Sequence, residues 1–246
     1  MRTKFLTALP VYNEAATVNE VLDEVVQYSD HVLVIDDGSA DETPQLLARR
    51  DDIIVLRHQE NRGYGAALIS AFDYAIQNGY EVLVTIDCDG QHEPQRIQQF
   101  VTACENTGAD IVSGSRYLKA FGADTPPPVQ RRRINMEITS VINERLGFEL
   151  TDAFCGFKAY RTGALHSLQL KETGYAMPLE LWVQAACHSL SVVEVAVPLI
   201  YLDENRSFGG QLDDGATRLK YYMDVLNRAF EALPEGCEKL RAARTG

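Results

Sequence analysis

The sequence predicts an α/β fold built on a mostly parallel central sheet. Through the first half, short apolar runs bounded by turn residues alternate with longer segments of helical period. This alternation is typical of parallel strands joined by crossover helices. The chain has 246 residues, of which 46% are hydrophobic and 24% charged. That length and composition are enough for one sizeable core, so we expect a single domain with helices flanking the sheet.

Five short apolar runs predict the strands, and each has the length usual for a buried strand. They cover residues 5–9, 31–35, 53–56, 81–86 and 110–113. Apolar side chains repeating at intervals of three and four predict helices within 18–25, 67–76 and 97–104. The segment Asp41-Glu-Thr-Pro44 predicts the start of another helix, because it combines a capping acid with a first-turn proline.

The second half is predicted with more connecting segments. Three consecutive prolines within residues 121–128 exclude a helix or a central strand, and we expect a mobile loop there. We expect helices at 131–145, 178–186 and 216–233, an extended segment at 157–160, and a strand or hairpin at 192–201. Residues 209–214 are predicted to be a flexible connection, and 234–246 a flexible tail.

Charge and cysteine content exclude several classes of protein. A formal charge of −12 argues against a nucleic-acid partner, which would need a basic face. Five cysteines, odd in number and without a C-x-x-C pair, predict reduced thiols rather than a disulfide framework or a zinc site. The apolar run at the N-terminus breaks at Pro10, and no stretch is long enough to span a bilayer. We therefore expect a cytoplasmic protein.

Three predicted strand ends carry carboxylates. The segment Pro10-Val-Tyr-Asn-Glu14 follows the first strand, Asp36-Asp-Gly-Ser39 the second, and Asp87-Cys-Asp-Gly-Gln-His-Glu-Pro94 the fourth. Ligands of open parallel sheets bind at the carboxyl edge of the strands. These side chains are therefore expected to converge on one cleft.

Asp87 and Asp89 form the most informative pair. Two carboxylates two residues apart, leaving a strand on a glycine turn, can offer oxygen ligands to a divalent cation shared with a diphosphate. The alternative is that these acids only cap the following helix. Similarly, Asp36 and Asp37 are either part of a plain turn or contacts of a nucleotide base or ribose.

Six motifs in order resemble family 2 glycosyltransferases, and the branch they resemble most is that of dolichol-phosphate mannose synthases and other polyprenyl-phosphate glycosyltransferases. The resemblance covers about residues 3–210. The motifs are Pro10-Val-Tyr-Asn-Glu14, Asp36-Asp-Gly-Ser39, Asn61-Arg-Gly-Tyr-Gly-Ala66, Asp87-Cys-Asp-Gly-Gln-His-Glu-Pro94, Gly114-Ser-Arg116 and Asp152-Ala-Phe-Cys-Gly-Phe157.

The resemblance implies a GT-A fold, a Mg²⁺ or Mn²⁺ ion, a nucleotide-sugar donor and inversion at the anomeric carbon. Residues 1–115 would form the nucleotide-sugar half of one domain and 116–233 the acceptor half. The nucleoside pocket would be lined by Pro10, Tyr12, Glu14, and Asp36 or Asp37. The metal and the sugar phosphate would be held by Asp87, Asp89 and Gln91. The basic positions near the diphosphate and acceptor would be Arg116 and Arg206.

Asp152 is the candidate base. A neutral hydroxyl acceptor needs a carboxylate within hydrogen-bond reach, whereas a lipid phosphate is already anionic and scarcely needs one. The resemblance favours a polyprenyl phosphate met by a protein peripheral to the membrane. A soluble acceptor is the alternative, because residues 135–147 are more polar than the membrane-resting helix of the branch. Arg131 to Arg133 and an apolar stripe there leave open either an interfacial helix or a packed one.

Other classes of function fit less well. A dinucleotide dehydrogenase would need G-x-G-x-x-G after the first strand, and a nucleotidyltransferase a glycine-rich arginine loop, whereas this chain has Pro10-Val-Tyr-Asn-Glu14. The remaining alternative is a non-catalytic nucleotide-sugar-binding protein. The presence of Asp87, Asp89, Asp152 and Arg206 argues against it.

Overall fold

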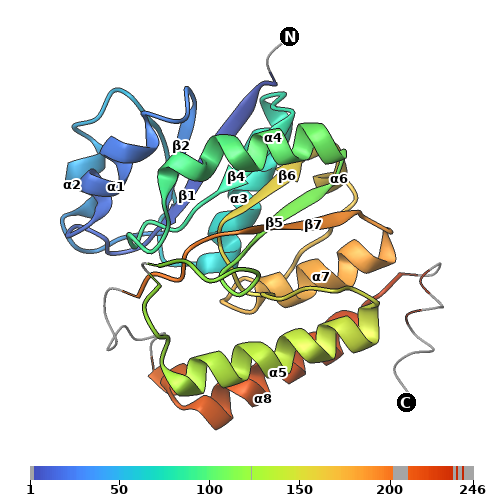
Figure 1. Cartoon of the computed structure of the whole chain (residues 1–246). Helices are drawn as coiled ribbons and strands as arrows, with labels where there is room; N and C mark the ends of the chain where they lie inside the picture. Colours follow the sequence, from blue (N-terminus) through green and yellow to red (C-terminus); the bar gives the residue numbers. More distant parts are fainter. Residues whose placement is uncertain (1–2, 123, 202–209, 235–236, 238–239, 241–246) are drawn as a thin grey trace.

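A seven-stranded sheet organises the molecule in this computed structural model, which describes residues 3–122, 124–201, 210–234, 237 and 240. The strand order is β3-β2-β1-β4-β6-β5-β7 (Figure 1). The strands are β1 (Phe5–Val11), β2 (Val32–Asp36), β3 (Ile54–Arg57), β4 (Val82–Thr85), β5 (Ile111–Ser115), β6 (Lys158–Arg161) and β7 (Val192–Ala196). The five predicted strands of the first half are confirmed within two residues at each end.

The sheet is parallel except for β6, which pairs antiparallel with β4 and β5. The order reverses direction between β1 and β4, so a crevice opens there at the carboxyl edge. Because β6 runs the other way, its first residue, Lys158, pairs with Thr85 and Ser113 near the ends of β4 and β5. The residues that precede β6 therefore reach the same edge as the residues that follow the parallel strands.

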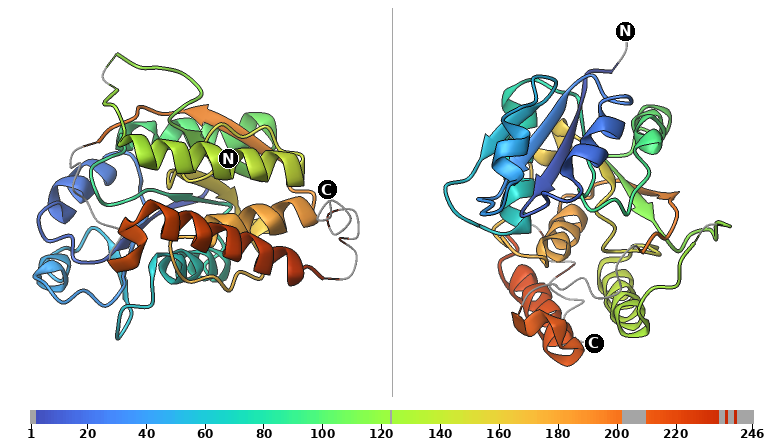
Figure 2. Two further views of the ribbon diagram at one scale, coloured as in Figure 1. Left: turned by 90° about the horizontal axis from the view of Figure 1, so that it is seen from below. Right: turned by 90° about the vertical axis from the view of Figure 1, so that its left-hand side faces the viewer.

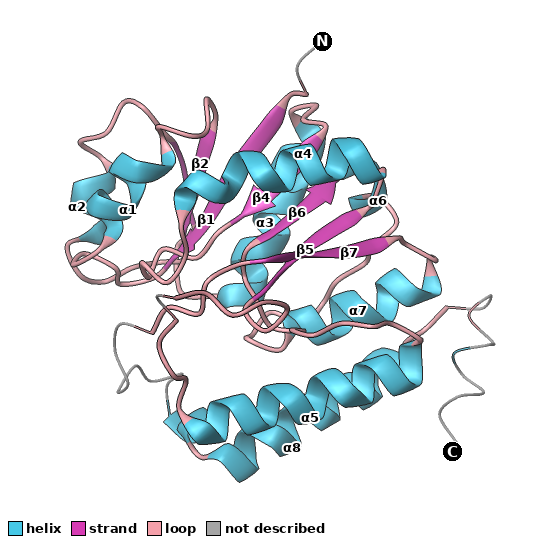
Figure 3. Ribbon diagram, viewed as in Figure 1, coloured by secondary structure: helices cyan, strands magenta, loops and turns pink. Residues whose placement is uncertain are grey.

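Helices cover both faces of the sheet (Figures 1 and 3). One face packs against α1 (Val18–Val25), α2 (Thr43–Leu47) and α4 (Ile97–Thr107), the last of which follows the short 3-10 helix η1 (Pro94–Arg96). The other packs against α3 (Tyr64–Gln77), α6 (Thr162–Leu165) and α7 (Met177–Cys187). The apolar repeats predicted for α1 and α4 are the faces that these helices bury. The α/β fold with a mostly parallel sheet is confirmed.

Two long helices form an outer layer. Helix α5 (Val129–Leu146) and helix α8 (Gly215–Glu231) lie side by side beyond α7 (Figures 1 and 2). The stripe Ile134, Ile138, Ile142 and Leu146 is buried in the core shared with α7 and α8. Helix α5 is thus a packed helix. None of the helices in the described ranges is both long and apolar enough to cross a membrane.

Two connections differ from the sequence predictions, and one open alternative is decided. The segment 121–128 is tied to the chain beyond β7: Asp124 accepts from Phe121 N and Leu199 N, and Thr125 N donates to Leu199 O. The expectation of a mobile loop overlooked these tertiary hydrogen bonds. For residues 192–201 the strand alternative is confirmed: Val192–Ala196 form β7, and residues 197–201 continue as a loop. Gly210–Asp213 forms a 3-10 helix, η2, instead of a flexible connection.

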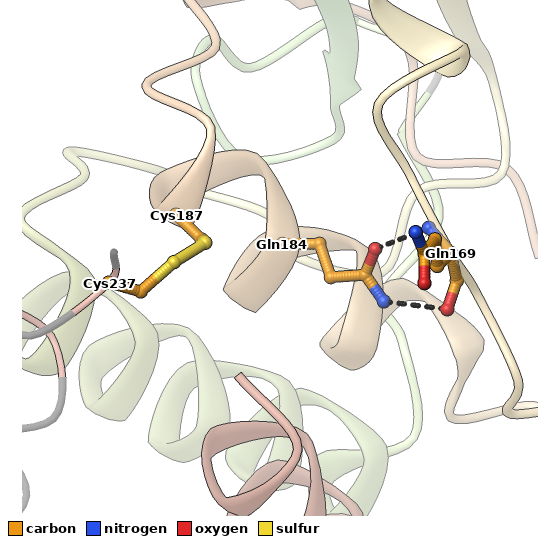
Figure 4. Close-up of a disulfide and its surroundings, with 4 residues drawn as sticks. All are labelled: Gln169, Gln184, Cys187 and Cys237. Carbon is orange, nitrogen blue, oxygen red and sulfur yellow. Dashed lines mark hydrogen bonds between the residues drawn. A yellow bond between two sulfur atoms is a disulfide. The ribbon is translucent and has the colours of Figure 1, made fainter. Parts of the chain in front are cut away.

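A disulfide joins Cys187, at the end of α7, to Cys237 beyond α8 (Figure 4). The expectation of five reduced thiols is therefore wrong for this pair, because contact across 50 residues of sequence leaves no signal in local spacing. Cys88, Cys104 and Cys155 are free and buried. On the same helix, Gln184 exchanges two hydrogen bonds with the backbone of Gln169. Helix α7 is thus fixed both to the segment before it and to the predicted tail.

Candidate active site

A cavity of about 460 Å³ lies at the carboxyl edge of the sheet, where the strand order reverses between β1 and β4. Eight of the residues nominated from the sequence line it. They are Pro10, Tyr12, Glu14, Asp37, Asp87, Asp89, Gln91 and Arg116. Asp36 and Asp152 do not line it, and Arg206 lies outside the described residues. The convergence expected from the strand ends is therefore observed for most of the set.

The turn after β1 presents Tyr12 to the cavity, with nearly half of that residue exposed. It can do so because Asn13 adopts a left-handed φ of 56°, which asparagine tolerates better than most residues. The Asn13 side chain accepts from Ala40 N, and its backbone N–H donates to the Ser39 hydroxyl. The ends of β1 and β2 are thereby locked together.

Asp36 and Asp37 have different roles. Asp36 is fully buried, accepts from Ser39 N at 2.9 Å and forms an ion pair with Arg57, so it shapes the turn and does not reach the cavity. Asp37 borders the cavity but is nearly buried. Its two oxygens accept from Arg62 N and Gly63 N at 3.0 and 2.7 Å. Of the two acids, only Asp37 lies where a nucleoside could touch it.

The turn after β4 brings Asp87, Asp89 and Gln91 to one wall of the cavity. Asp89 accepts from Gln91 N at 3.0 Å, which closes the turn over Gly90, whose φ is 71°. Asp87 accepts from the Tyr64 hydroxyl at 2.9 Å, and His92 Nε2 lies 3.5 Å from its other oxygen. Burial, and then the neighbouring Asp87 charge, raise the pKa of Tyr64 well above its usual value.

The donor set of this wall suits Mg²⁺ or Mn²⁺. Its side chains offer carboxylate and amide oxygens, the ligands that hard cations take. No cluster of three or more His, Cys, Asp or Glu suited to a metal is found in the part of the chain that the structure describes. Two acids fit a cation that takes its other ligands from phosphates and water, which is the usual arrangement for Mg²⁺. The residues present therefore fit a cation shared with a diphosphate.

Arg116, which follows β5, forms a bidentate ion pair with Asp152. The guanidinium donates through Nε and Nη2 at 2.6 and 3.0 Å, and Asn135 Nδ2 of α5 donates to the same carboxylate at 2.9 Å. The Asp152 side chain is completely buried. Its position just before β6 brings it to this edge. The pair therefore fixes the Arg116 guanidinium in the cavity wall.

This environment argues against Asp152 as a base. Burial alone would raise the pKa of Asp152, but the charge of Arg116 and the hydrogen bonds from Arg116 and Asn135 lower it to about 2. A carboxylate with so low a pKa is a weak base, and Asp152 does not line the cavity. The proposal that Asp152 acts as a base stays a prediction, and in the structure its carboxylate is engaged by Arg116.

Glu194 of β7 was not foreseen from the sequence, yet it supports this arrangement. Its carboxylate accepts from Thr151 N, the Thr151 hydroxyl and Asp152 N, at distances from 2.7 to 3.1 Å. An acid inside an amphipathic-looking strand gives no local signal of such a contact. Glu194 fixes the turn that carries Asp152, and through it Arg116.

The helices of the outer layer supply a second wall that sequence reasoning also missed. Arg131 of α5 and Arg218 of α8 line the cavity, together with the aromatic residues Tyr117, Phe154, Tyr175, Tyr201 and Tyr222. Arg218 is almost completely buried. Burial lowers its pKa, and the nearby Arg131 charge lowers it further. Two guanidinium groups that repel each other thus line the same cavity, a suitable setting for an anion.

Comparison with known proteins relates the chain to enzymes of sugar transfer. The family described as glycosyl transferase family 2 matches residues 7–168. The polyprenol monophosphomannose synthase of Mycolicibacterium smegmatis is 32% identical over 202 residues, which are 78% of this chain and 76% of the relative. The undecaprenyl-phosphate mannosyltransferase of Micrococcus luteus is 31% identical over 219 residues, covering 84% of this chain and 88% of the relative.

Among solved structures, the glucosyl-3-phosphoglycerate synthase of Mycobacterium tuberculosis superimposes with a TM-score of 0.72 at 19% identity, covering 95% of this chain and 81% of that chain. That structure contains Mn²⁺, UDP-glucose and phosphoglyceric acid, and another structure of the same enzyme contains Mg²⁺ and UDP. At this identity the similarity concerns the fold, and it confirms the GT-A architecture.

Proposed function

The chain belongs to glycosyl transferase family 2, and on that premise we propose that it transfers a hexose from a nucleoside-diphosphate donor to a polyprenyl phosphate. The transfer depends on Mg²⁺ or Mn²⁺ and inverts the anomeric carbon. Mannose is the first choice of sugar, because both relatives described above are named for it. The protein meets its acceptor at the surface of a membrane.

One observation carries the donor half of the proposal: a single cavity is lined by Asp87, Asp89 and Arg116. Departure of a nucleoside diphosphate leaves negative charge on its outer phosphate. Asp87, Asp89 and Gln91 would hold the cation, which supplies charge stabilisation when bound. Arg116, held rigid by Asp152, offers fixed N–H donors to the same phosphate.

The acceptor half is supported by the arginines of the outer layer. Arg131 and Arg218 both line the cavity, where an anionic phosphate would offset their mutual repulsion. An acceptor phosphate is ionised at neutral pH and attacks without giving up a proton. The low pKa of Asp152 therefore presents no obstacle to this acceptor.

A soluble anionic acceptor is the second candidate, and one observation favours it. Helix α5 buries its apolar stripe against α7 and α8, leaving little of it for a membrane. The same two arginines would receive a phosphate or carboxylate of a water-soluble molecule. The two candidates share donor and metal and differ only in what carries the anion.

A transfer assay tests the proposal. Radiolabelled GDP-mannose, UDP-glucose and UDP-N-acetylglucosamine are offered, with Mn²⁺ or with EDTA, to short-chain polyprenyl phosphates and in parallel to a lipid-free extract. We expect Mn²⁺-dependent label in an organic-soluble product, with the anomeric configuration inverted. Label appearing only in water-soluble products would replace the lipid acceptor by the second candidate. Absence of transfer from every donor to either acceptor pool would contradict the proposed function.

A further inference from the structure

The segment between β3 and α3, residues Asn61 to Tyr64, is built with unusual rigidity. Gly63 has a φ of 102°, and a Cβ there would lie 2.4 Å from the Thr173 carbonyl oxygen. A Cβ on Gly65 would meet the Glu172 carbonyl oxygen at 2.5 Å. Only glycine fits at these two positions, so the backbone beneath the cavity is pressed against the segment that leads to α7.

A network of hydrogen bonds through Asp37, His58 and Ser70 fixes the same segment. Asp37 accepts from the backbone N–H groups of Arg62 and Gly63, and His58 Nδ1 lies 2.6 Å from the same carboxylate. His58 Nε2 lies 2.9 Å from the Ser70 hydroxyl of α3. The His58 ring is buried. The carboxylate of Asp37, both ring nitrogens of His58 and the hydroxyl of Ser70 all have hydrogen-bond partners. The segment from Asn61 to Tyr64 is therefore held in one conformation.

The rigid segment places Tyr64 beside the part of the cavity lined by Asp87, Asp89 and Gln91, which we call the cation wall. The Tyr64 ring stacks on Tyr175 with their centroids 5.7 Å apart, and its hydroxyl donates to Asp87 Oδ1 at 2.9 Å. Gly156 approaches the same carboxylate so closely that a Cβ there would lie 2.1 Å from Asp87 Oδ2. The Asp87 carboxylate is thus confined between a hydroxyl and a backbone.

We propose that Tyr64 is a positioning residue that holds the Asp87 carboxylate in the orientation required by the divalent cation, and this inference rests on the metal site of the proposed function. A hydrogen-bonded ligand keeps its geometry when the cation is absent, so less ordering is needed on binding. Partners of this kind typically contribute 10- to 100-fold to metal affinity. In this proposal Gly63 and Gly65 act on the cation site indirectly, because they allow the close packing that fixes Tyr64.

The test compares Tyr64→Phe with the parent protein. The change removes one oxygen and retains the ring that stacks on Tyr175. Mn²⁺ is titrated into protein saturated with GDP or with UDP, in separate calorimetric series, and each nucleotide is also titrated in EDTA. We expect the apparent Mn²⁺ dissociation constant of Tyr64→Phe to rise by about 10-fold or more. Nucleotide affinity in EDTA should be unchanged, which separates lost cation positioning from general damage to the pocket.

Tyr221→Phe is the matched control, because its hydroxyl donates to Glu172 at 2.6 Å and not to Asp87. We expect this variant to bind Mn²⁺ as the parent does. Parent-like Mn²⁺ affinity in Tyr64→Phe, with metal-dependent binding intact in the parent, would overturn the inference and leave the proposed function standing. Equal loss in both variants would also overturn it. Metal-independent binding in the parent itself would overturn the metal site and the inference together.

Discussion

Two sets of carboxylates lie near the same edge of the sheet, and their surroundings differ sharply. Asp87 and Asp89 face the cavity, and the Asp87 side chain is 27% exposed. Asp152 is 0% exposed and is surrounded by donors from Arg116, Asn135 and the backbone of Phe154. The first pair can accept a ligand that enters from solvent, whereas the bonding capacity of Asp152 is already occupied.

The difference shows that neighbours, more than residue type, decide what an acid does. A carboxylate beside an open cavity can bind a cation that arrives with a substrate. A carboxylate whose charge is neutralised by a bidentate arginine becomes part of the scaffold and orients that arginine. The sequence motifs nominate acids in both places, and the structure places Asp87 and Asp89 in the cavity lining and Asp152 against Arg116.

The largest effect is expected from Asp89→Asn. Removing an anionic ligand should lower the rate of sugar transfer about 1,000-fold, because a bound cation contributes several kcal/mol of charge stabilisation. The rate is measured with radiolabelled donor and Mn²⁺. Asp73→Asn, at an exposed position of α3, is the matched control and should retain the parent rate. Near-parent activity of Asp89→Asn would remove this residue from the cation wall.

Asp152→Asn should act mainly on stability. Breaking one side of a buried ion pair leaves Arg116 without its counter-charge, and the free energy of unfolding should fall by about 3 kcal/mol. Urea denaturation followed by circular dichroism measures it. The surface change Asp73→Asn should alter the free energy of unfolding by less than about 0.5 kcal/mol. If the two variants were equally stable, the buried pair would not be the scaffold described above.

Lowering the pH should remove the stabilisation that the ionised Asp152 carboxylate contributes. The folded-state pKa of Asp152 is lowered to about 2, so its stabilisation is present above the unfolded pKa near 4 and is lost as the pH falls toward 2. Between those values the parent should lose about 2 kcal/mol more than Asp152→Asn does. Urea unfolding of both proteins across this range provides the comparison. A stability difference that does not change with pH would contradict the assigned pKa.

The smallest effect concerns the confinement of Asp87. In Gly156→Ala the new methyl group would lie 2.1 Å from Asp87 Oδ2, so the carboxylate must move. We expect the Mn²⁺ affinity of the nucleotide complex to weaken about 10-fold, as for other changes around metal ligands. Gly163→Ala serves as the control, since its Cβ would meet nothing within 4 Å. Indistinguishable Mn²⁺ affinities in the two variants would show that Asp87 is not confined.

The strand ends could be predicted from the sequence because their signals are local. Buried strands are short apolar runs, and in a parallel sheet the residue after each run lies at a known edge. This rule places the carboxylates of Asp37 and Asp87 at the cavity, whereas Tyr12 is predicted there from the family resemblance. The rule does not resolve adjacent acids, which is why Asp36, buried in its own turn, was nominated together with Asp37.

The remaining features depend on tertiary contacts that sequence periodicity does not record. The pairing of Asp152 with Arg116 arises because β6 runs antiparallel and brings residue 152 to the carboxyl edge. Arg131 and Arg218 reach the cavity only because α5 and α8 pack beside each other. On these helices an arginine looks like any solvated charge. Likewise, the bond between Cys187 and Cys237 depends on where α7 and α8 end.

A parallel Mn²⁺ titration of the variants of Asp89 and Asp152 tests the central claim most directly. Mn²⁺ is titrated into nucleotide-saturated parent, Asp89→Asn and Asp152→Asn under identical conditions. The account predicts that Asp89→Asn loses Mn²⁺-dependent nucleotide binding, because the cation loses an anionic ligand. Asp152→Asn should keep that dependence, with nucleotide affinity weakened through the loosened Arg116. Retention of Mn²⁺-dependent binding in Asp89→Asn, or its loss in Asp152→Asn, would contradict the division of roles between the two sites.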